Sequence, residues 1–207
     1  MKAHFEAINK ATRSALEVLK KSKIADDFYL AGGTGLAFML GHRESRDLDF
    51  FRKEPFNEKR LVEHLRRVGG FSLEKRELGT VLGQLLKVRV SFFHYPYLFI
   101  NRLEKMAGVH VASVRDIGCM KLDALSARGA KRDFVDIYSV VTKTPNSLYG
   151  LLRAYRRKYV QINPNIVHIK KSLVYFSDAE SDPMPKVLTA VSWKEIKDFF
   201  IKEVKKL

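Results

Sequence analysis

Two glycines between two apolar runs constrain the fold of this chain more than any other segment. Residues 28–41 read FYLAGGTGLAFMLG. The run FYLA is short and apolar, as in a buried strand, and it ends at Gly32-Gly33. Thr34 to Leu40 have the composition of a helix, which stops at Gly41. A strand that turns directly into a helix predicts a domain in which helices pack on a sheet.

The hydrophobic periodicity predicts the remaining elements. Expected helices before residue 100 are 5–21 and 57–68, and expected strands are 47–51, 71–78 and 84–93, with a turn bracketed by Gly79 and Gly83. After residue 100 the pattern becomes helical, and we expect helices at 113–127, 132–142, 147–159, 164–176 and 192–206, with an exposed loop at 177–186. Ser192 and Glu195 form a capping-box pattern at the last helix.

These elements predict an α+β fold in two parts. A small mixed β-sheet with flanking helices would occupy residues 1–100, and a C-terminal helical bundle would occupy residues 101–207. The 207 residues, 46% of them hydrophobic, are enough to bury such a core.

The charge of the chain indicates a polyanionic partner. Lys and Arg number 38 against 23 Asp and Glu, so the formal net charge is +15. The excess is spread over the last three quarters of the sequence, which indicates a folded basic surface that meets nucleic acid or an acidic protein. A surface that only keeps the protein soluble is the alternative.

Several classes of protein are disfavoured. No apolar run approaches the roughly 18 residues that cross a bilayer, and the N-terminal residues lack a secretory pattern. Cys119 is the single cysteine, and the six histidines are scattered, so disulfides and Cys- or His-built metal sites are not expected. We therefore expect a cytoplasmic protein without membrane contact.

Two features carry the candidate chemistry. Glycines at the start of a helix let backbone N–H groups approach a phosphate, although such a turn is often only geometry. Asp47 and Asp49 stand at alternate positions of an expected strand, so both carboxylates would point to one side. Oxygen ligands of this kind suit Mg²⁺ or Mn²⁺ with bound nucleotide phosphates, whereas the alternative is a solvated acidic pair.

Together these residues resemble a known family. LAGGTGLAFMLGHRESRDLDFF (30–51) is similar to the first motif of the nucleotidyltransferase superfamily of the DNA polymerase β type, and more narrowly of the AbiEii-type toxins of type IV toxin–antitoxin systems. In that family a GG or GS turn precedes an arginine-bearing segment, here with Arg43 and Arg46, and then DxD. MKLDALSARGAKRDFVDIY (120–138) resembles the family's later motifs, and the resemblance covers roughly residues 28–140.

The resemblance implies a nucleotidyltransferase fold, a reaction and a set of site residues. The implied reaction moves a nucleoside monophosphate from an NTP, with Mg²⁺ (or Mn²⁺), to an RNA acceptor such as a tRNA 3′ end. The protein would be a toxin with an antitoxin protein as a partner. The helical part would complete the active site. The implied nucleotide-binding residues are Gly32, Gly33, Thr34, Arg46 and Lys121, the implied metal ligands are Asp47 and Asp49, and the implied catalytic residues are Asp47, Asp49, Lys121 and Asp136.

Two of these assignments have structural alternatives. Lys121 also fits a surface lysine whose stem covers an apolar helix face. Asp133 and Asp136 share a helix face, where Arg128 and Arg132 are the nearby cations, and a structural salt-bridge cluster would explain them as well. We expect Asp133 to be the structural member.

One residue departs from the superfamily pattern. Ser91, in the expected strand, stands where a third carboxylate is common. Either Asp136 replaces that group or catalysis is weak, and the second case leads to another function: a degenerate transferase fold that serves as a non-catalytic RNA- or protein-binding module. A protein hydroxyl or a small molecule is a further possible acceptor.

Overall fold

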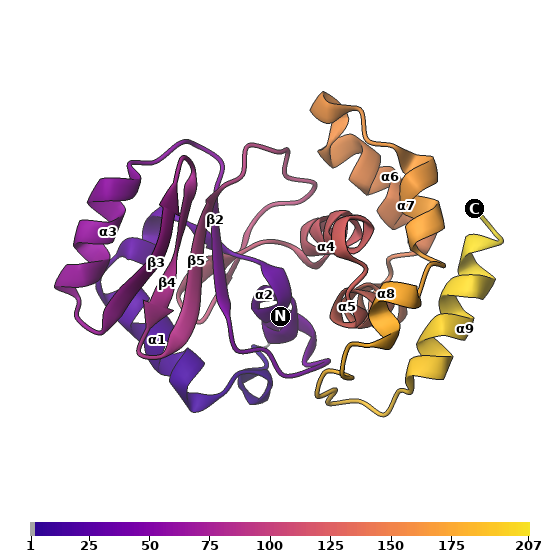
Figure 1. Ribbon diagram of the computed structural model, residues 1–207, viewed down its shortest axis with the longest axis horizontal. Helices are drawn as coiled ribbons and strands as arrows, with labels where there is room; N and C mark the ends of the chain where they lie inside the picture. Colours follow the sequence, from indigo (N-terminus) through magenta and orange to yellow (C-terminus); the bar gives the residue numbers. More distant parts are fainter. Residues whose placement is uncertain (1–2) are drawn as a thin grey trace. The chain divides into compact units, whose positions relative to one another are not determined.

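The computed structural model describes residues 3–207, which divide into two compact units (Figure 1). The sheet unit comprises the described residues through Tyr97 together with Arg102–Ala112, and the helical unit comprises Leu98–Asn101 and Ser113–Leu207. Two short strands, Glu104–Met106 and Val109–Val111, follow the boundary expected after residue 100 but belong to the sheet unit. The α+β class, with a mixed sheet followed by helices, is confirmed.

The sheet of the described residues has seven strands in the order β3-β4-β5-β2-β1-β7-β6. β2 runs parallel to β5 and β1 parallel to β7, whereas the other neighbours are antiparallel. The strands are β1 (Tyr29–Leu30), β2 (Leu48–Arg52), β3 (Phe71–Glu77), β4 (Thr80–Leu85), β5 (Val88–His94), β6 (Glu104–Met106) and β7 (Val109–Val111).

The helices of the sheet unit differ from expectation mainly at their first residues. They are α1 (Lys10–Lys21), α2 (Gly32–Leu40) and α3 (Glu58–Arg67), with short 3-10 helices at Phe5–Ala7 and Ile24–Asp27. The expected helix 5–21 is interrupted because the Asn9 side chain accepts a hydrogen bond from the N–H of Thr12 at 2.8 Å and so caps a new helix. The helix expected from Thr34 begins at Gly32.

The single strand expected over 84–93 is wrong, because a tight turn divides it into β4 and β5. Leu86 and Lys87 have φ values of 52° and 65°, which is the geometry of a two-residue hairpin turn usually made by Asn or Gly. Gly83, expected to border a turn, lies inside β4. A Cβ there would stand 2.4 Å from the Ser72 carbonyl oxygen. This glycine is required by close strand packing instead of by a turn.

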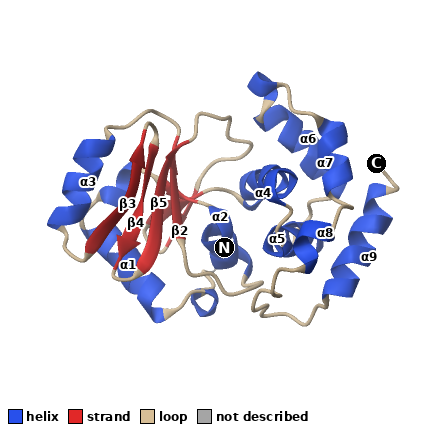
Figure 2. Ribbon diagram, in the orientation of Figure 1, coloured by secondary structure: helices blue, strands red, loops and turns tan. Residues whose placement is uncertain are grey.

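The helical unit is built around α4 (Figure 2), which packs against α5, α6 and α7, while α8 and α9 pack on α5. Its helices are α4 (Val114–Arg128), α5 (Lys131–Thr142), α6 (Leu148–Lys158), α7 (Ile166–Ser172), α8 (Ser177–Glu180) and α9 (Trp193–Val204), with a 3-10 helix at Val160–Ile162. The capping box of Ser192 and Glu195 is confirmed. The segment 177–186, expected as a loop, begins with α8. No helix within residues 3–207 has both the length and the apolar character needed to span a membrane.

A buried ion pair anchors the helical unit. The fully buried Asp116 carboxylate accepts hydrogen bonds from the backbone N–H groups of Ile100 (2.9 Å) and Asn101 (3.0 Å). It also accepts from the Ser113 hydroxyl at 2.6 Å and from Lys158 Nζ at 2.8 Å. The pair therefore joins α4, α6 and the segment Leu98–Asn101.

We predict that Lys158→Met lowers the free energy of unfolding by about 3–5 kcal/mol, because it leaves the buried Asp116 charge without a cation. Thermal unfolding followed by circular dichroism measures the effect. The double variant Lys158→Met/Asp116→Leu is the control and should recover part of the loss, since it removes both charges. A single variant as stable as the parent chain would contradict this account of the anchor.

Candidate active site

The start of α2 lies directly against the side chains of the segment that follows it. Gly32 has a φ of +61°, and a Cβ at this position would stand 2.5 Å from Asp49 Oδ2. A Cβ at Gly33 would stand 2.5 Å from Arg43 Nη2. Glycine is needed at Gly32 both for its left-handed conformation and for the space that the Asp49 carboxylate occupies.

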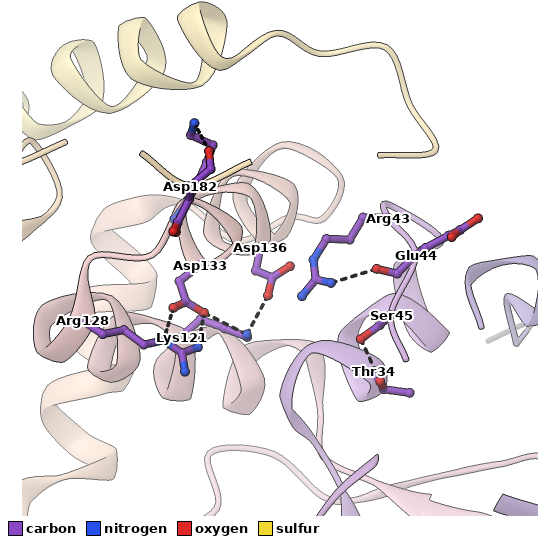
Figure 3. A network of polar contacts seen from close by, with 10 residues as sticks. Thr34, Arg43, Glu44, Ser45, Lys121, Arg128, Asp133, Asp136 and Asp182 are labelled. Carbon is purple, nitrogen blue, oxygen red and sulfur yellow. Dashed lines mark hydrogen bonds and ion pairs between the residues drawn. The ribbon is translucent and has the colours of Figure 1, made fainter. Parts of the chain in front are cut away.

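Backbone and hydroxyl hydrogen bonds fix this proximity. The Ala31 N–H donates to the Asp49 carbonyl at 3.0 Å. The Thr34 hydroxyl donates to the Asp47 carbonyl and shares a hydrogen bond of 2.8 Å with Ser45 Oγ (Figure 3). The backbone at both aspartates is therefore attached to the first turn of α2.

The strand β2 positions only one of the two expected carboxylates. Asp47 lies one residue before the strand, which begins at Leu48, so the strand geometry applies only to Asp49. Leu48 and Phe50 are fully buried and Asp49 is half-buried, as expected for alternate faces. Asp49 pairs in register with Ser91 of the parallel strand β5, so the serine occupies the neighbouring position on the same face.

Of the two arginines in the arginine-bearing segment, the one that was not among the expected nucleotide-binding residues lies at the turn. Arg43 is buried, and its Nη1 donates to the Glu44 carbonyl at 2.9 Å (Figure 3). Arg46, named from the sequence, is exposed, and its backbone carbonyl accepts from the Thr12 hydroxyl at 2.8 Å. Both arginines stand in the segment HRESR, and only the tertiary packing distinguishes them.

The second group of expected residues lies within the helical unit. The Lys121 side chain is only 7% exposed, so it is not a surface lysine. Its Nζ lies 2.7 Å from Asp136 Oδ2 and 3.0 Å from Asp133 Oδ1 (Figure 3). α4 and α5 thus bring Lys121 and Asp136 together.

The Asp133 carboxylate, for which we expected a structural role, binds two cations, Lys121 and Arg128. Arg128 binds it with Nε at 2.7 Å and Nη2 at 2.9 Å, whereas Arg132 is exposed. Burial alone raises the pKa of Asp133, but the Lys121 ammonium, the Arg128 hydrogen bonds and the Arg128 charge together outweigh burial. The net result is a pKa below the ordinary carboxyl value, so Asp133 stays ionised and holds Lys121 in place.

The group at α2 has the chemistry of a phosphate and cation site. The first N–H groups of a helix lack intrahelical partners, and the N-cap residue Ala31 supplies no capping side chain. Such a helix end attracts anions. Within residues 3–207 no cluster of three or more Asp, Glu, His or Cys side chains is placed to hold a metal ion. Asp47 and Asp49 fit Mg²⁺ as two ligands, because this ion commonly binds one or two carboxylates together with substrate phosphates.

Comparisons with known proteins agree with the resemblance seen in the sequence. The family described as "Nucleotidyl transferase AbiEii toxin, Type IV TA system" matches residues 14–104 and 86–206. An uncharacterized protein of Aquifex aeolicus (strain VF5) is 37% identical over 205 residues, which are 96% of each chain.

Two solved structures share the fold. MenT4, a nucleotidyltransferase toxin of Mycobacterium tuberculosis H37Rv, has a TM-score of 0.59 at 15% identity, covering 96% of this chain and 86% of that chain. A putative nucleotidyltransferase of H. pylori has a TM-score of 0.51 at 17% identity, covering 96% and 97%. The expected fold is confirmed.

We predict that Asp133→Asn destabilises the protein by about 3 kcal/mol or more at pH 6, because it leaves Lys121 and Arg128 without their shared anion. A lowered folded-state pKa contributes stability above the unfolded-state value of about 3.9, and that stability disappears as the pH falls through the folded-state value. The gap in the free energy of unfolding between Asp133→Asn and the parent chain should therefore narrow below about pH 4.

Urea unfolding at pH 6, 4 and 3 measures this gap. Asp198→Asn is the control, because Asp198 pairs with Lys194 on an exposed surface at 2.9 Å and such pairs contribute little. Its effect should stay within about 0.5 kcal/mol at every pH. A gap for Asp133→Asn that does not change with pH would contradict the assigned ionisation.

Proposed function

The chain belongs to the AbiEii nucleotidyltransferase toxin family of type IV toxin–antitoxin systems and is a nucleotidyltransferase, and from this premise we propose that it transfers a nucleoside monophosphate from an NTP to an RNA acceptor with the help of Mg²⁺. The observation that supports this most is the Asp49 carboxylate held against the first turn of α2. That arrangement brings an acidic ligand and an anion-binding helix end to the same place.

The sheet unit would bind the triphosphate. The N–H groups of Gly33 and Thr34 and the guanidinium of Arg43 are the donors for phosphate oxygens. Asp47 and Asp49 would hold Mg²⁺ or Mn²⁺, which supplies positive charge to the triphosphate. The Thr34 hydroxyl is already engaged by Asp47 and Ser45, so Thr34 would act through its backbone.

Two residues of the helical unit would serve the same reaction. The acceptor hydroxyl oxygen forms a bond to the α-phosphorus, and the bond from this phosphorus to the bridging oxygen breaks. Pyrophosphate leaves, and the hydroxyl proton passes to water. Lys121 would steady the leaving phosphates. Asp136 would orient the acceptor hydroxyl, because a carboxylate bound to an ammonium group at 2.7 Å positions a proton donor better than it removes the proton.

The acceptor that we propose is the 3′ end of a tRNA. The net charge of +15 favours a polyanion, and phosphate contacts from Lys and Arg make such binding strongly salt-dependent. Blocking acceptor ends in the cytoplasm would explain toxicity, with a separate antitoxin protein as counterweight. The similar fold of MenT4, which is a nucleotidyltransferase toxin, supports this proposal.

A second candidate function rests on Ser91. Ser91 lies in β5 directly beside Asp49 of β2, so the sheet has no third carboxylate at that position. A serine hydroxyl lacks the charge that a hard cation prefers in its ligands. A non-catalytic RNA- or protein-binding module is therefore the rival, and an assay of transfer separates the two.

We predict that the purified protein, incubated with total RNA, Mg²⁺ and each α-³²P-labelled NTP in turn, labels a tRNA-sized band with at least one nucleotide. Asp49→Asn should reduce the label by about 10²-fold or more, because it removes the negative charge of a proposed metal ligand and so weakens the cation that stabilises the reacting phosphates. Asp27→Asn is the matched control, since Asp27 is an exposed acid outside the site, and it should keep full activity.

The remaining outcomes are also decisive. Mg²⁺-dependent label on the protein or on an added partner would support nucleotidyl transfer with a protein acceptor in place of RNA. The absence of label in every lane, with RNA still bound by the protein, would favour the non-catalytic binding module.

We also predict that Gly32→Ala weakens Mg²⁺-dependent ATP binding at least about tenfold, because the new Cβ displaces the Asp49 carboxylate. Gly69→Ala is the matched control. Gly69 has a similar positive φ of +79°, but nothing lies within 4 Å of its added Cβ. Both variants should lose stability through backbone strain of roughly 1–2 kcal/mol, and only Gly32→Ala should lose nucleotide affinity, as measured by titration calorimetry. Equal affinities in the two variants would argue against a role for this contact.

A further inference from the structure

One stretch of the helical unit contains cations but no acids. The sequence has no Asp or Glu between Asp136 and Asp178. A surface that serves only solubility mixes charges of both signs. The cations of this stretch are Lys143, Arg153, Arg156, Arg157, Lys158, Lys170 and Lys171.

Three of these cations share the exposed face of α6. Arg153, Arg156 and Arg157, which we call the arginine stripe, are exposed, and the last two follow Arg153 by three and four residues. Tyr149 continues the same face one turn earlier and is 60% exposed, and its ring centroid lies 5.9 Å from the Arg153 guanidinium. The opposite face of α6 is buried and mostly apolar.

The arginines of the stripe differ from two lysines of α9, which are paired with acids. Lys194 pairs with Asp198 at 2.9 Å, and Lys197 pairs with Glu180 at 2.8 Å. Across residues 3–207, no acid pairs with an arginine of the stripe. The positive charge of Lys194 and Lys197 is thus balanced by nearby acids, whereas that of the arginine stripe is left available on α6.

Polar contacts hold α6 rigidly on α4. Arg115 Nη2 donates to the Gly150 carbonyl at 3.1 Å, and the Tyr155 hydroxyl donates to Asp123 Oδ1 at 2.9 Å. The buried ion pair of Lys158 and Asp116 adds a third contact at the end of the helix. A rigid support lowers the entropic cost of binding at its exposed face.

We infer that the arginine stripe, with Tyr149, binds the phosphate backbone of the RNA acceptor. The inference rests on the proposed function for the identity of the polyanion. Guanidinium groups bind phosphates in a bidentate manner. An exposed tyrosine beside them offers a face on which a base stacks, and this pairing favours RNA over an acidic protein.

The test measures binding without any NTP. The full chain is titrated into labelled bulk tRNA by filter binding between 50 and 200 mM salt. The variant Arg153→Gln/Arg156→Gln/Arg157→Gln should lose at least about tenfold in affinity. The slope of log K against log salt should fall by about 2 to 3, because three phosphate contacts are lost.

α3 provides a matched control. It carries three exposed arginines, Arg60, Arg66 and Arg67, but Glu58 and Glu63 belong to the same helix. The variant Arg60→Gln/Arg66→Gln/Arg67→Gln removes the same number of charges and should keep nearly the parent affinity. Circular dichroism verifies that both variants are folded.

Three results would overturn the inference. Equal losses in the two triple variants would show a general attraction by net charge. Unchanged tRNA affinity in the α6 variant would leave an acidic protein as the occupant of the arginine stripe. Failure of the parent chain to bind tRNA would exclude RNA from the surface.

The inference and the proposed function fail in different ways. Binding through α6 without transfer of label would refute the proposed transfer alone. Transfer of label to tRNA with an unaffected α6 variant would refute the arginine stripe alone.

Discussion

The hydrogen bonds between the start of α2 and the start of β2 are the constraint on which the sheet unit depends. The Ala31 N–H and the Thr34 hydroxyl reach the carbonyls of Asp49 and Asp47. They attach the backbone that bears the acids to a helix end that attracts anions. Gly32 is what permits this approach, because any Cβ there would collide with the Asp49 carboxylate. Local backbone geometry therefore holds the segment of Asp47 and Asp49 against the first turn of α2.

The helical unit uses a different principle, which is charge neutralisation inside a low-dielectric interior. Lys121 is buried with two carboxylates, and Arg128 is the second cation that binds Asp133. Because each charge has a partner, their mutual attraction offsets part of the desolvation penalty and holds the ammonium group in a fixed position. A lysine held in this way resembles a preorganised electrostatic group more than a mobile surface cation.

The distribution of acids decides which basic residues are available to a partner. Net charge alone favours a polyanion but does not say where it binds. On α9 two lysines, Lys194 and Lys197, are paired with acids, whereas the arginines of the stripe have no acid within the same stretch of sequence. A modest local difference in composition thus distinguishes a solvated helix from a candidate RNA surface.

The sequence by itself determined the α+β class, most helix positions and the two motifs, because hydrophobic periodicity and glycine placement are local signals. It did not determine the turn at Leu86 and Lys87, since neither residue type indicates a positive φ. It also could not distinguish Arg43 from Arg46 or show that Lys121 is buried, because burial depends on packing between segments distant in sequence. Only the tertiary structure decided these points, through contacts that no periodicity encodes.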